Sequence, residues 1–153
     1  TVLGELVHNP EVLRRLRGAG IESVADTRAP VRTAAVMITA HGAADREVLR
    51  LREQGLQVVD ATCPLVRHAH RSLRRLVEAG YYPVVIGREQ HVEVQGLVGD
   101  LDEVTVLESE ADICRLPARP RYGVISQTTQ PLARVLQLVQ AMRRQLGEAE
   151  VRF

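Results

Sequence analysis

The amino-acid sequence predicts an α/β fold made of two similar βαβ lobes with parallel sheets. Short apolar and β-branched runs alternate along the chain with helical segments of about 10 to 16 residues. One run, Ala34 to Thr39, is almost continuously apolar, which is typical of a strand covered on both faces of a parallel sheet. About four strands precede Pro64 and about four follow it. We therefore place a first lobe at residues 1–63 and a second at residues 64–153.

The elements of the first lobe are bounded by turn-forming residues. Pro10 suits the first position of a helix that ends at Gly18. Three apolar residues of this helix, Val12, Leu13 and Leu16, share one face. The expected strands of the first lobe are residues 1–7, 21–24, 34–39 and 57–60, and the expected helices are residues 10–18 and 45–54.

The second lobe begins with the longest expected helix, residues 64–79. Leu65, Ala69 and Leu73 recur in it at helical spacing, and Gly80 follows its last turn. Residues 91–96 form either a short helix or a loop. The other expected elements are strands at residues 83–86, 104–107, 122–126 and from 151 onward, with helices at residues 110–116 and 131–146.

Composition restricts the possible functions. Hydrophobic residues make up 45% of the chain, charged residues 25%, and the net charge is +1. These values are typical of a soluble globular protein and argue against nucleic acid as a partner. All 20 basic residues are Arg, which excludes lysine Schiff-base and P-loop mechanisms.

The cellular location is inferred from three features. The two cysteines, Cys63 and Cys114, form no disulfide pattern. No apolar stretch is long enough to span a membrane, and no signal peptide opens the chain. We therefore expect a cytoplasmic protein with no membrane partner. Because the first residue is Thr1 rather than Met, we expect the chain to come from a longer or trimmed translation product.

Cys63 occupies the most informative position of the sequence. A β-branched run ends at Asp60 and Pro64 opens the long helix, so Cys63 lies where a strand passes into a helix. Backbone N–H groups at a helix N-terminus favour a thiolate, the form of cysteine that binds metals or attacks electrophiles. The alternative is that Cys63 is a small buried hydrophobic residue.

Other polar side chains also follow predicted strands. Ligands of open α/β sheets bind beyond the carboxyl ends of the strands, so residues at these positions are expected to share one rim. Imidazole and hydroxyl groups at such a rim suit the binding of an anion. The residues expected there are His8, His41, Cys63, His91 and Thr128.

Several of these features have a structural alternative. Glu93 is either a proton donor, if it is buried, or an ordinary acidic residue of a first helical turn. The polar run at residues 126–130 is longer than an N-cap before Pro131 requires, although an N-cap is the simpler interpretation. The residues interpreted as structural are His68, His70 and Cys114.

Together these segments resemble the 4-hydroxy-3-methylbut-2-enyl diphosphate reductase family, the LytB-type iron–sulfur enzymes of the non-mevalonate isoprenoid pathway. The matching motifs occur in the family's order and with similar spacing. Their combination is specific, because several polar motifs must coincide at strand ends. The motifs are GELVHN at residues 4–9, AHG at 40–42, DATCPLV at 60–66, HVEVQG at 91–96 and SQTT at 126–129.

The resemblance implies an oxidoreductase that removes the allylic hydroxyl of 4-hydroxy-3-methylbut-2-enyl diphosphate. The products would be isopentenyl and dimethylallyl diphosphates, and an electron donor such as ferredoxin or flavodoxin would supply electrons. Cys63 would be one of three cysteine ligands of a [4Fe–4S] cluster, a cofactor suited to single-electron chemistry. The implied substrate-binding residues are His8, His41, His91 and Thr128, and the implied catalytic residues are Glu93 and Thr128.

The sequence departs from the family pattern in two respects. Gln90 and Val92 flank His91 where the family usually has Gly and Pro, so the backbone of this loop is expected to differ. The family's first cluster cysteine precedes the region that matches Thr1, and its third follows the region that matches Phe153. We therefore expect a truncated part of a three-lobed trefoil, without the third lobe and the N-terminal part of the first, that is inactive by itself.

Two other functions are compatible with the same residues. In a non-enzymatic α/β module, His8, His41 and Thr128 would bind phosphate or another anion, and Cys63 would be structural. In a cysteine-dependent hydrolase, His41 would act as the base that activates Cys63. Absorbance at about 400 nm in an anaerobic preparation would favour the iron–sulfur reductase.

Overall fold

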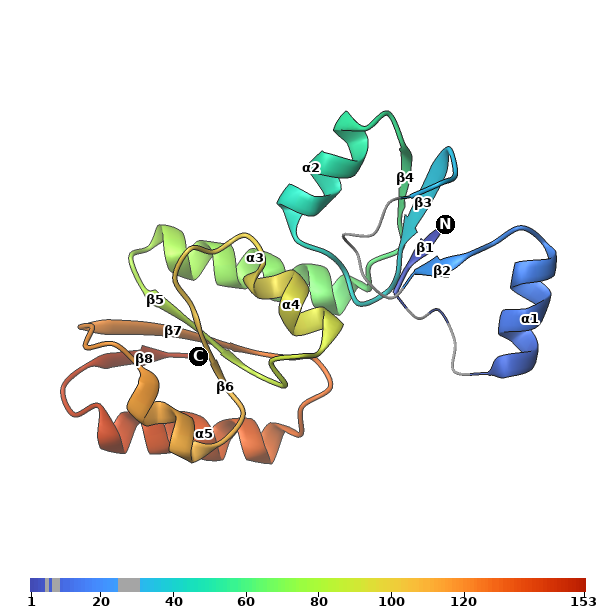
Figure 1. Cartoon of the computed structure of the whole chain (residues 1–153). Coiled ribbons are helices and arrows are strands. Elements are labelled where there is room, and N and C mark those ends of the chain that lie inside the picture. Colours follow the sequence, from blue (N-terminus) through green and yellow to red (C-terminus); the bar gives the residue numbers. More distant parts are fainter. Residues whose placement is uncertain (5, 7–8, 25–30) are drawn as a thin grey trace.

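The computed structural model describes residues 1–4, 6, 9–24 and 31–153, and these form two sheets with connecting helices (Figure 1). All strand pairs within the two sheets are parallel, which confirms the predicted α/β fold. The first sheet contains β1 (Val2–Leu3), β2 (Ser23–Val24), β3 (Ala35–Ile38) and β4 (Gln57–Asp60). The second contains β5 (Tyr82–Ile86), β6 (Thr105–Leu107), β7 (Arg121–Ser126) and β8 (Glu150–Arg152).

Both sheets have the same strand order. The first is ordered β2-β1-β3-β4 and the second β6-β5-β7-β8, so in each the second strand is at one edge and the fourth at the other. The helices are α1 (Pro10–Gly18), α2 (Asp45–Glu53), α3 (Pro64–Glu78), α4 (Val92–Val98) and α5 (Leu132–Gln145), with a 3-10 helix, η1, at Glu110–Arg115. Each lobe therefore repeats the alternation of strands and helices from which the sequence predicts two similar lobes.

The second sheet is covered on both faces. Along β5, Val84 and Ile86 belong to one buried cluster, whereas Val85 belongs to the other, as the period of two in a strand requires. Figure 1 shows α3 and α4 on one face of this sheet and α5 on the other. Helix α3 therefore packs on the second lobe, to which Ala69 and Leu73 contribute buried contacts.

The first sheet has a smaller core. Its described buried cluster consists of Leu3, Val36 and Leu51, which joins α2 to one face of the sheet. The expectation that residues 34–39 are covered on both faces is wrong for β3, because Ala35 and Met37 are only half-buried. The expected apolar face of α1 also lacks a buried residue. Figure 1 shows the reason, since α1 stands beside the sheet and not over it.

Several predicted boundaries differ from the structure. The first strand ends at Leu3, and Gly4 follows with a φ of 92°, a left-handed conformation that glycine adopts without strain. The expected helix at residues 110–116 is a 3-10 helix, and the segment from Val92 is a true α-helix. Helix α5 begins at Leu132, with Pro131 as its N-cap.

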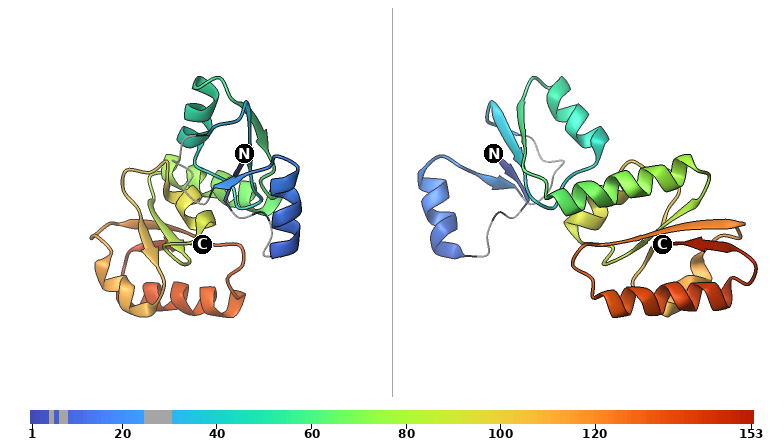
Figure 2. Two further views of the ribbon diagram at one scale, coloured as in Figure 1. Left: turned by 45° about the vertical axis from the view of Figure 1, so that its right-hand side comes forward. Right: turned by 180° about the vertical axis from the view of Figure 1, so that it is seen from behind.

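The two lobes meet near the start of α3, as Figure 1 and the right-hand view of Figure 2 show. The register of the strands brings their carboxyl ends together within each lobe. Ile38 of β3 is paired with Asp60 of β4, and Ile86 of β5 is paired with Ser126 of β7. Within each lobe, the loops that follow the two paired strands are therefore neighbours, and these loops carry the candidate residues.

Candidate functional site

Glu93 and Thr128 form the best-defined contact of the site. The Glu93 side chain is buried, with 1% of its surface exposed, and lies in the first turn of α4. The Thr128 backbone N–H donates to Glu93 Oε1 at 2.7 Å, and the Thr128 hydroxyl donates to Oε2 at 3.0 Å. A buried carboxyl group requires such partners, so this pair is a built feature of the fold.

The strand order explains why these two residues meet. Strand β5 precedes α4, and its neighbour β7 precedes the loop that carries Thr128. The sequence predicted Glu93 either as a buried proton donor or as an acidic residue of a first helical turn. Glu93 lies in the first turn of α4 and is also buried. Burial is the condition under which the sequence predicts Glu93 as a proton donor.

His91 is the N-cap of α4. Its Nδ1 accepts a hydrogen bond from the Glu93 backbone N–H at 3.1 Å. Because Nδ1 is an acceptor, the proton of the neutral ring belongs on Nε2, which is then a donor. His91 can therefore offer Nε2–H to an anion at the same helix end where Glu93 is held.

His41 brings the first lobe to the same place. Its ring meets the His91 ring edge to face, with centroids 5.6 Å apart and an interplanar angle of 77°. His41 Nδ1 also lies 3.4 Å from Thr39 Oγ1, and Thr39 is itself buried. The two imidazoles thus come from different lobes and form a pair that no single lobe provides.

Cys63 is the N-cap residue of α3 and is half-buried. Its backbone N–H donates to the Ala40 carbonyl at 3.0 Å, which ties the loop after β4 to the loop that carries His41. Cys63 therefore lies at the predicted strand-to-helix junction, and its partial exposure does not fit the alternative of a small buried hydrophobic residue.

Asp60 shapes the turn before Cys63. Its Oδ1 accepts the Thr62 backbone N–H at 2.9 Å, an Asx turn, and also the Thr62 hydroxyl. Burial acts to raise the pKa of Asp60, but the Thr62 hydrogen bonds and the positive charge of Arg67 outweigh it and lower the pKa below its usual value. Asp60 is therefore a charged anchor of this loop at neutral pH.

A [4Fe–4S] cluster needs several thiolate ligands. Among the described residues, no group of three or more His, Cys, Asp or Glu side chains is arranged to hold a metal ion. Cys114, interpreted from the sequence as packed, is instead exposed in η1, where its thiol lies 3.1 Å from the Ala111 carbonyl oxygen. The described residues thus offer one thiol, Cys63, at the strand-end rim and do not by themselves fit the cluster.

His8 lies outside the described residues, so its predicted place at the rim has no structural description. In the loop with the departures at Gln90 and Val92, His91 is the N-cap of α4. Its N–H donates to the Arg88 carbonyl at 2.9 Å, and Val92 is the first residue of α4. No described residue other than glycine has a positive φ, so Gln90 needs no special backbone conformation in this loop.

Gln127 is a polar residue of the site that the sequence reasoning did not single out. It is buried, its Oε1 accepts the Arg88 backbone N–H at 3.2 Å, and its Nε2 donates to Thr129 Oγ1 at 2.8 Å. Helix α5 has no side-chain cap, so the N-cap interpretation of the polar run is wrong. The run instead fixes the loop beside Glu93, and a Gln directly after a buried strand was the available signal.

The sequence predicts structural roles for His68 and His70. His68 is exposed, with Nε2 3.4 Å from the Ser72 hydroxyl. His70 Nε2 is buried and has no hydrogen-bond partner among the described residues. His70 is therefore not a structural residue whose hydrogen-bonding groups are all satisfied. Burial lowers the pKa of His70 from its usual 6.5, although the carboxylates of Asp45 and Asp100 act in the opposite direction.

We expect His70 to make the protein less stable in acid. The folded state binds a proton on His70 less readily than the unfolded chain does. The contribution of neutral His70 to the free energy of unfolding is therefore complete above pH 6.5 and is lost as the pH falls below that value. The free energy of unfolding is measured by urea unfolding, followed by circular dichroism, at pH 5 and pH 7. Its difference between the two pH values should be larger for the natural chain than for His70→Gln. The exposed His68→Gln is the control, and equal differences in all three proteins would contradict the expectation.

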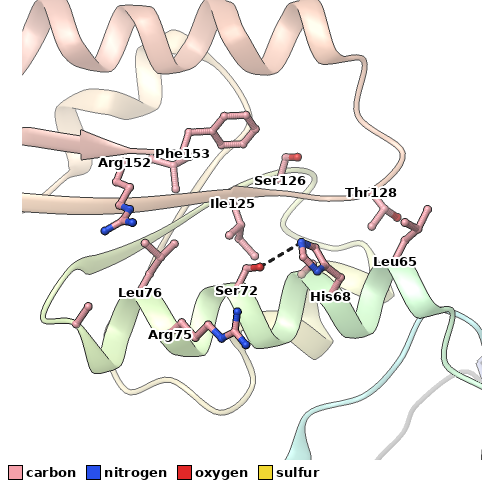
Figure 3. A pocket seen from close by; sticks show the side chains of 13 residues that line it. Leu65, His68, Ser72, Arg75, Leu76, Ile125, Ser126, Thr128, Arg152 and Phe153 are labelled. Atoms are coloured by element: carbon pink, nitrogen blue, oxygen red, sulfur yellow. Dashed lines mark hydrogen bonds between the residues drawn. The ribbon is translucent and has the colours of Figure 1, made fainter.

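A cavity of about 720 Å³ lies between α3 and β7 (Figure 3). Leu76 and Ile125 give it apolar walls, and Thr128 lies at the end near Leu65. A second cavity of about 660 Å³ lies between the lobes and is lined by residues that include Thr39 and Gly96. Residues of the strand-end rim border both cavities, with Thr128 at the first and Thr39 at the second. The hydrogen bonds and ring contacts of the rim residues, and not the size of a cavity, identify the candidate site.

Comparison with known proteins gives one consistent family. A family model described as LytB protein matches residues 1–153. Proteins named 4-hydroxy-3-methylbut-2-enyl diphosphate reductase from Pelobacter propionicus and Citrifermentans bemidjiense are 34% and 37% identical over 150 residues, which is 97% of this chain and 53% of each relative. The chain thus spans about half the length of these curated relatives.

Solved structures agree with this result. A structure of (E)-4-hydroxy-3-methyl-but-2-enyl diphosphate reductase, described as the terminal enzyme of the non-mevalonate pathway, is 31% identical, with a TM-score of 0.84 over 99% of this chain and 54% of that one. The corresponding reductase from Plasmodium falciparum is 25% identical, with a TM-score of 0.83 over 98% of this chain and 48% of that one.

Proposed function

Because the chain belongs to the LytB protein family, we propose that a full-length protein containing it is a 4-hydroxy-3-methylbut-2-enyl diphosphate reductase. In the proposed reaction, two electrons and two protons convert the allylic hydroxyl to water and yield isopentenyl or dimethylallyl diphosphate. The observation that carries the proposal is the buried Glu93–Thr128 pair beside the contact of His41 with His91.

The two imidazoles suit the diphosphate end of this substrate. We assign His41 and His91 to diphosphate binding, with His91 donating from Nε2, and place His8 with them on the family resemblance alone. Charge-assisted hydrogen bonds to phosphate oxygens are strong, and donors from two lobes can converge on one anion. Substrate binding would then depend on how the lobes are held together.

Glu93 and Thr128 suit proton delivery. When Glu93 Oε2 carries a proton, it can donate that proton to the Thr128 hydroxyl while the hydroxyl passes its own proton to the departing oxygen. This step reverses the hydrogen bond of the structure, in which the hydroxyl donates to Oε2. Thr128 would therefore also contact the substrate. The backbone N–H of Thr128 keeps Oε1 fixed while the proton moves through the other oxygen.

The LytB family uses a [4Fe–4S] cluster. We propose that Cys63 is one of its three cysteine ligands and that the others belong to parts of the full-length protein not contained in residues 1–153. We also propose lobe limits at residues 1–63 and 64–153, within a three-lobed trefoil. This division assigns Cys63 to the first lobe and α3 to the second.

The proposed partners are the allylic diphosphate and an electron donor such as ferredoxin or flavodoxin. The unpaired cysteines Cys63 and Cys114 suit the reducing conditions of the cytoplasm. No helix among the described residues is both long and apolar enough to cross a membrane.

The 153-residue chain alone is expected to hold no intact cluster and to be inactive, because one thiol at the rim cannot replace three. After anaerobic reconstitution, iron and sulfide analysis should find no stoichiometric [4Fe–4S] centre on the isolated chain. A full-length relative, reconstituted in parallel, serves as the positive control. A stable stoichiometric cluster on this chain would contradict the proposed division of ligands.

The function itself is tested with the full-length protein under anaerobic conditions. Incubated with 4-hydroxy-3-methylbut-2-enyl diphosphate and a chemical reductant, it should release isopentenyl and dimethylallyl diphosphates, identified by mass spectrometry. Release of inorganic phosphate or of a free diol would instead indicate a hydrolase. Tight binding of the substrate without any conversion would indicate an anion-binding module.

A further inference from the structure

The first lobe is fastened to the second by a contact that the sequence motifs do not include. Helix α2 has Ala44 as its N-cap, and this residue has no side chain that can cap the helix. Its free amides are satisfied from the other lobe. The backbone N–H of Asp45 donates to Asp100 Oδ2 at 2.7 Å, and that of Arg46 donates to Oδ1 at 2.9 Å.

Asp100 thus supplies a bidentate cap to a helix that begins 55 residues earlier in the chain. A carboxylate at a helix N-terminus is stabilised both by the hydrogen bonds and by the helix dipole. Asp100 is exposed, so this contact lies at the protein surface and is not part of a buried core. Arg74 and Asp45 form a nearby ion pair in which both side chains are exposed, so this pair adds little stability to the contact between the lobes.

Two glycines bring the same segments into close contact. A Cβ atom on Gly96 would lie 3.4 Å from the Ala43 Cα, and one on Gly99 would lie 2.6 Å from the Ala44 Cβ. The second distance is shorter than real Cβ atoms tolerate, so Gly99 must lack a side chain for the lobes to approach this closely. We name residues 43–46 with Gly96, Gly99 and Asp100 the interlobe latch.

The latch lies directly beside the paired imidazoles. His41 is two residues before Ala43, and His91 caps the helix that carries Gly96. Any movement of residues 43–46 on the latch would therefore move His41 relative to His91. We propose that Asp100 is a positioning residue, which holds His41 against His91 so that both can bind one diphosphate.

The contact itself can be tested without turnover. In the full-length protein, Asp100→Ala should speed hydrogen exchange by roughly tenfold in a peptide that covers Asp45 and Arg46, because both amides lose their acceptor. Asp100→Asn keeps an acceptor oxygen and should restore part of the protection. Asp102→Ala, which removes an exposed carboxylate two residues away, should leave exchange unchanged. Unchanged exchange in Asp100→Ala would overturn the latch.

The positioning role rests on the proposed function and has a kinetic test. Asp100→Ala should raise KM for the allylic diphosphate by roughly tenfold and change kcat less, with Asp100→Asn intermediate. An unchanged KM alongside faster exchange would overturn the positioning role. If the natural full-length protein shows no reductase activity, the proposed function fails, and the exchange experiment still decides whether the latch exists. Should Asp100→Ala not fold, Asp100→Asn against Asp102→Ala gives the same comparison.

Discussion

Replacing Glu93 with Gln in a full-length protein that contains this chain is expected to lower kcat by about 10²- to 10⁴-fold. Gln has nearly the same size and keeps a carbonyl oxygen that can accept the Thr128 backbone N–H. It cannot carry the transferable proton of a carboxyl group. Because the side chain is buried and held on both oxygens, its substitution should change chemistry more than structure.

Substrate affinity separates this role from a structural one. The dissociation constant of the allylic diphosphate should stay within a few-fold in Glu93→Gln, since the imidazoles and not the carboxyl group are assigned to the diphosphate. Glu89→Gln changes an exposed carboxyl in the same connection and should have normal rates. Near-normal turnover in Glu93→Gln would show that protons arrive by another route.

Thr128 provides a second way to test the relay. Thr128→Ser keeps a hydroxyl that can donate to Glu93 Oε2 and should retain most of the activity. Thr128→Val removes the hydroxyl with little change in volume and should resemble Glu93→Gln. Equal activity in the two Thr128 variants would exclude the hydroxyl from proton transfer.

Replacing Cys63 with Ser in the full-length protein is expected to abolish cluster binding and turnover together. A serine hydroxyl is a poor substitute for a thiolate ligand of iron. The fold should survive, because Ser is among the best N-cap residues and Cys63 is the N-cap of α3, where its own side chain makes no capping hydrogen bond. Loss of function without loss of helix is therefore the distinguishing result.

Iron and sulfide content and absorbance at about 400 nm measure cluster binding, and far-ultraviolet circular dichroism measures the fold separately. Cys114→Ser is the matched control, since Cys114 is exposed and lies in η1, away from the strand ends that form the rim. That variant should keep its cluster and its rate. Retained turnover in Cys63→Ser would remove Cys63 from the proposed ligand set.

The features that could be predicted from the sequence are those set by local spacing. Proline and glycine at the ends of α1 and α3, together with apolar periodicity, located most elements because these signals act within one turn or one strand. The rim was predictable for the same reason. His41 and Cys63 follow neighbouring strands of the first sheet, and His91 and Thr128 follow neighbouring strands of the second, so parallel pairing puts each pair at one edge of its own sheet.

The features that could not be predicted depend on contacts between distant segments. The apolar pattern of residues 34–39 could not reveal that Ala35 and Met37 lack full cover, since that depends on where α1 packs. Nothing in the local sequence marks Asp100 as the cap of α2, because its partners lie in the other lobe. The depth at which Glu93 is buried likewise follows from the pairing of β5 with β7.

We propose that side chains from both lobes bind one substrate molecule. The slow Glu93→Gln full-length protein allows this to be measured, because without a reductant it should hold the allylic diphosphate unconverted. Hydrogen exchange with and without that ligand should show slower exchange both in residues 40–46 of the first lobe and in residues 88–95 of the second. Protection confined to one lobe, or protection in neither, would contradict the account.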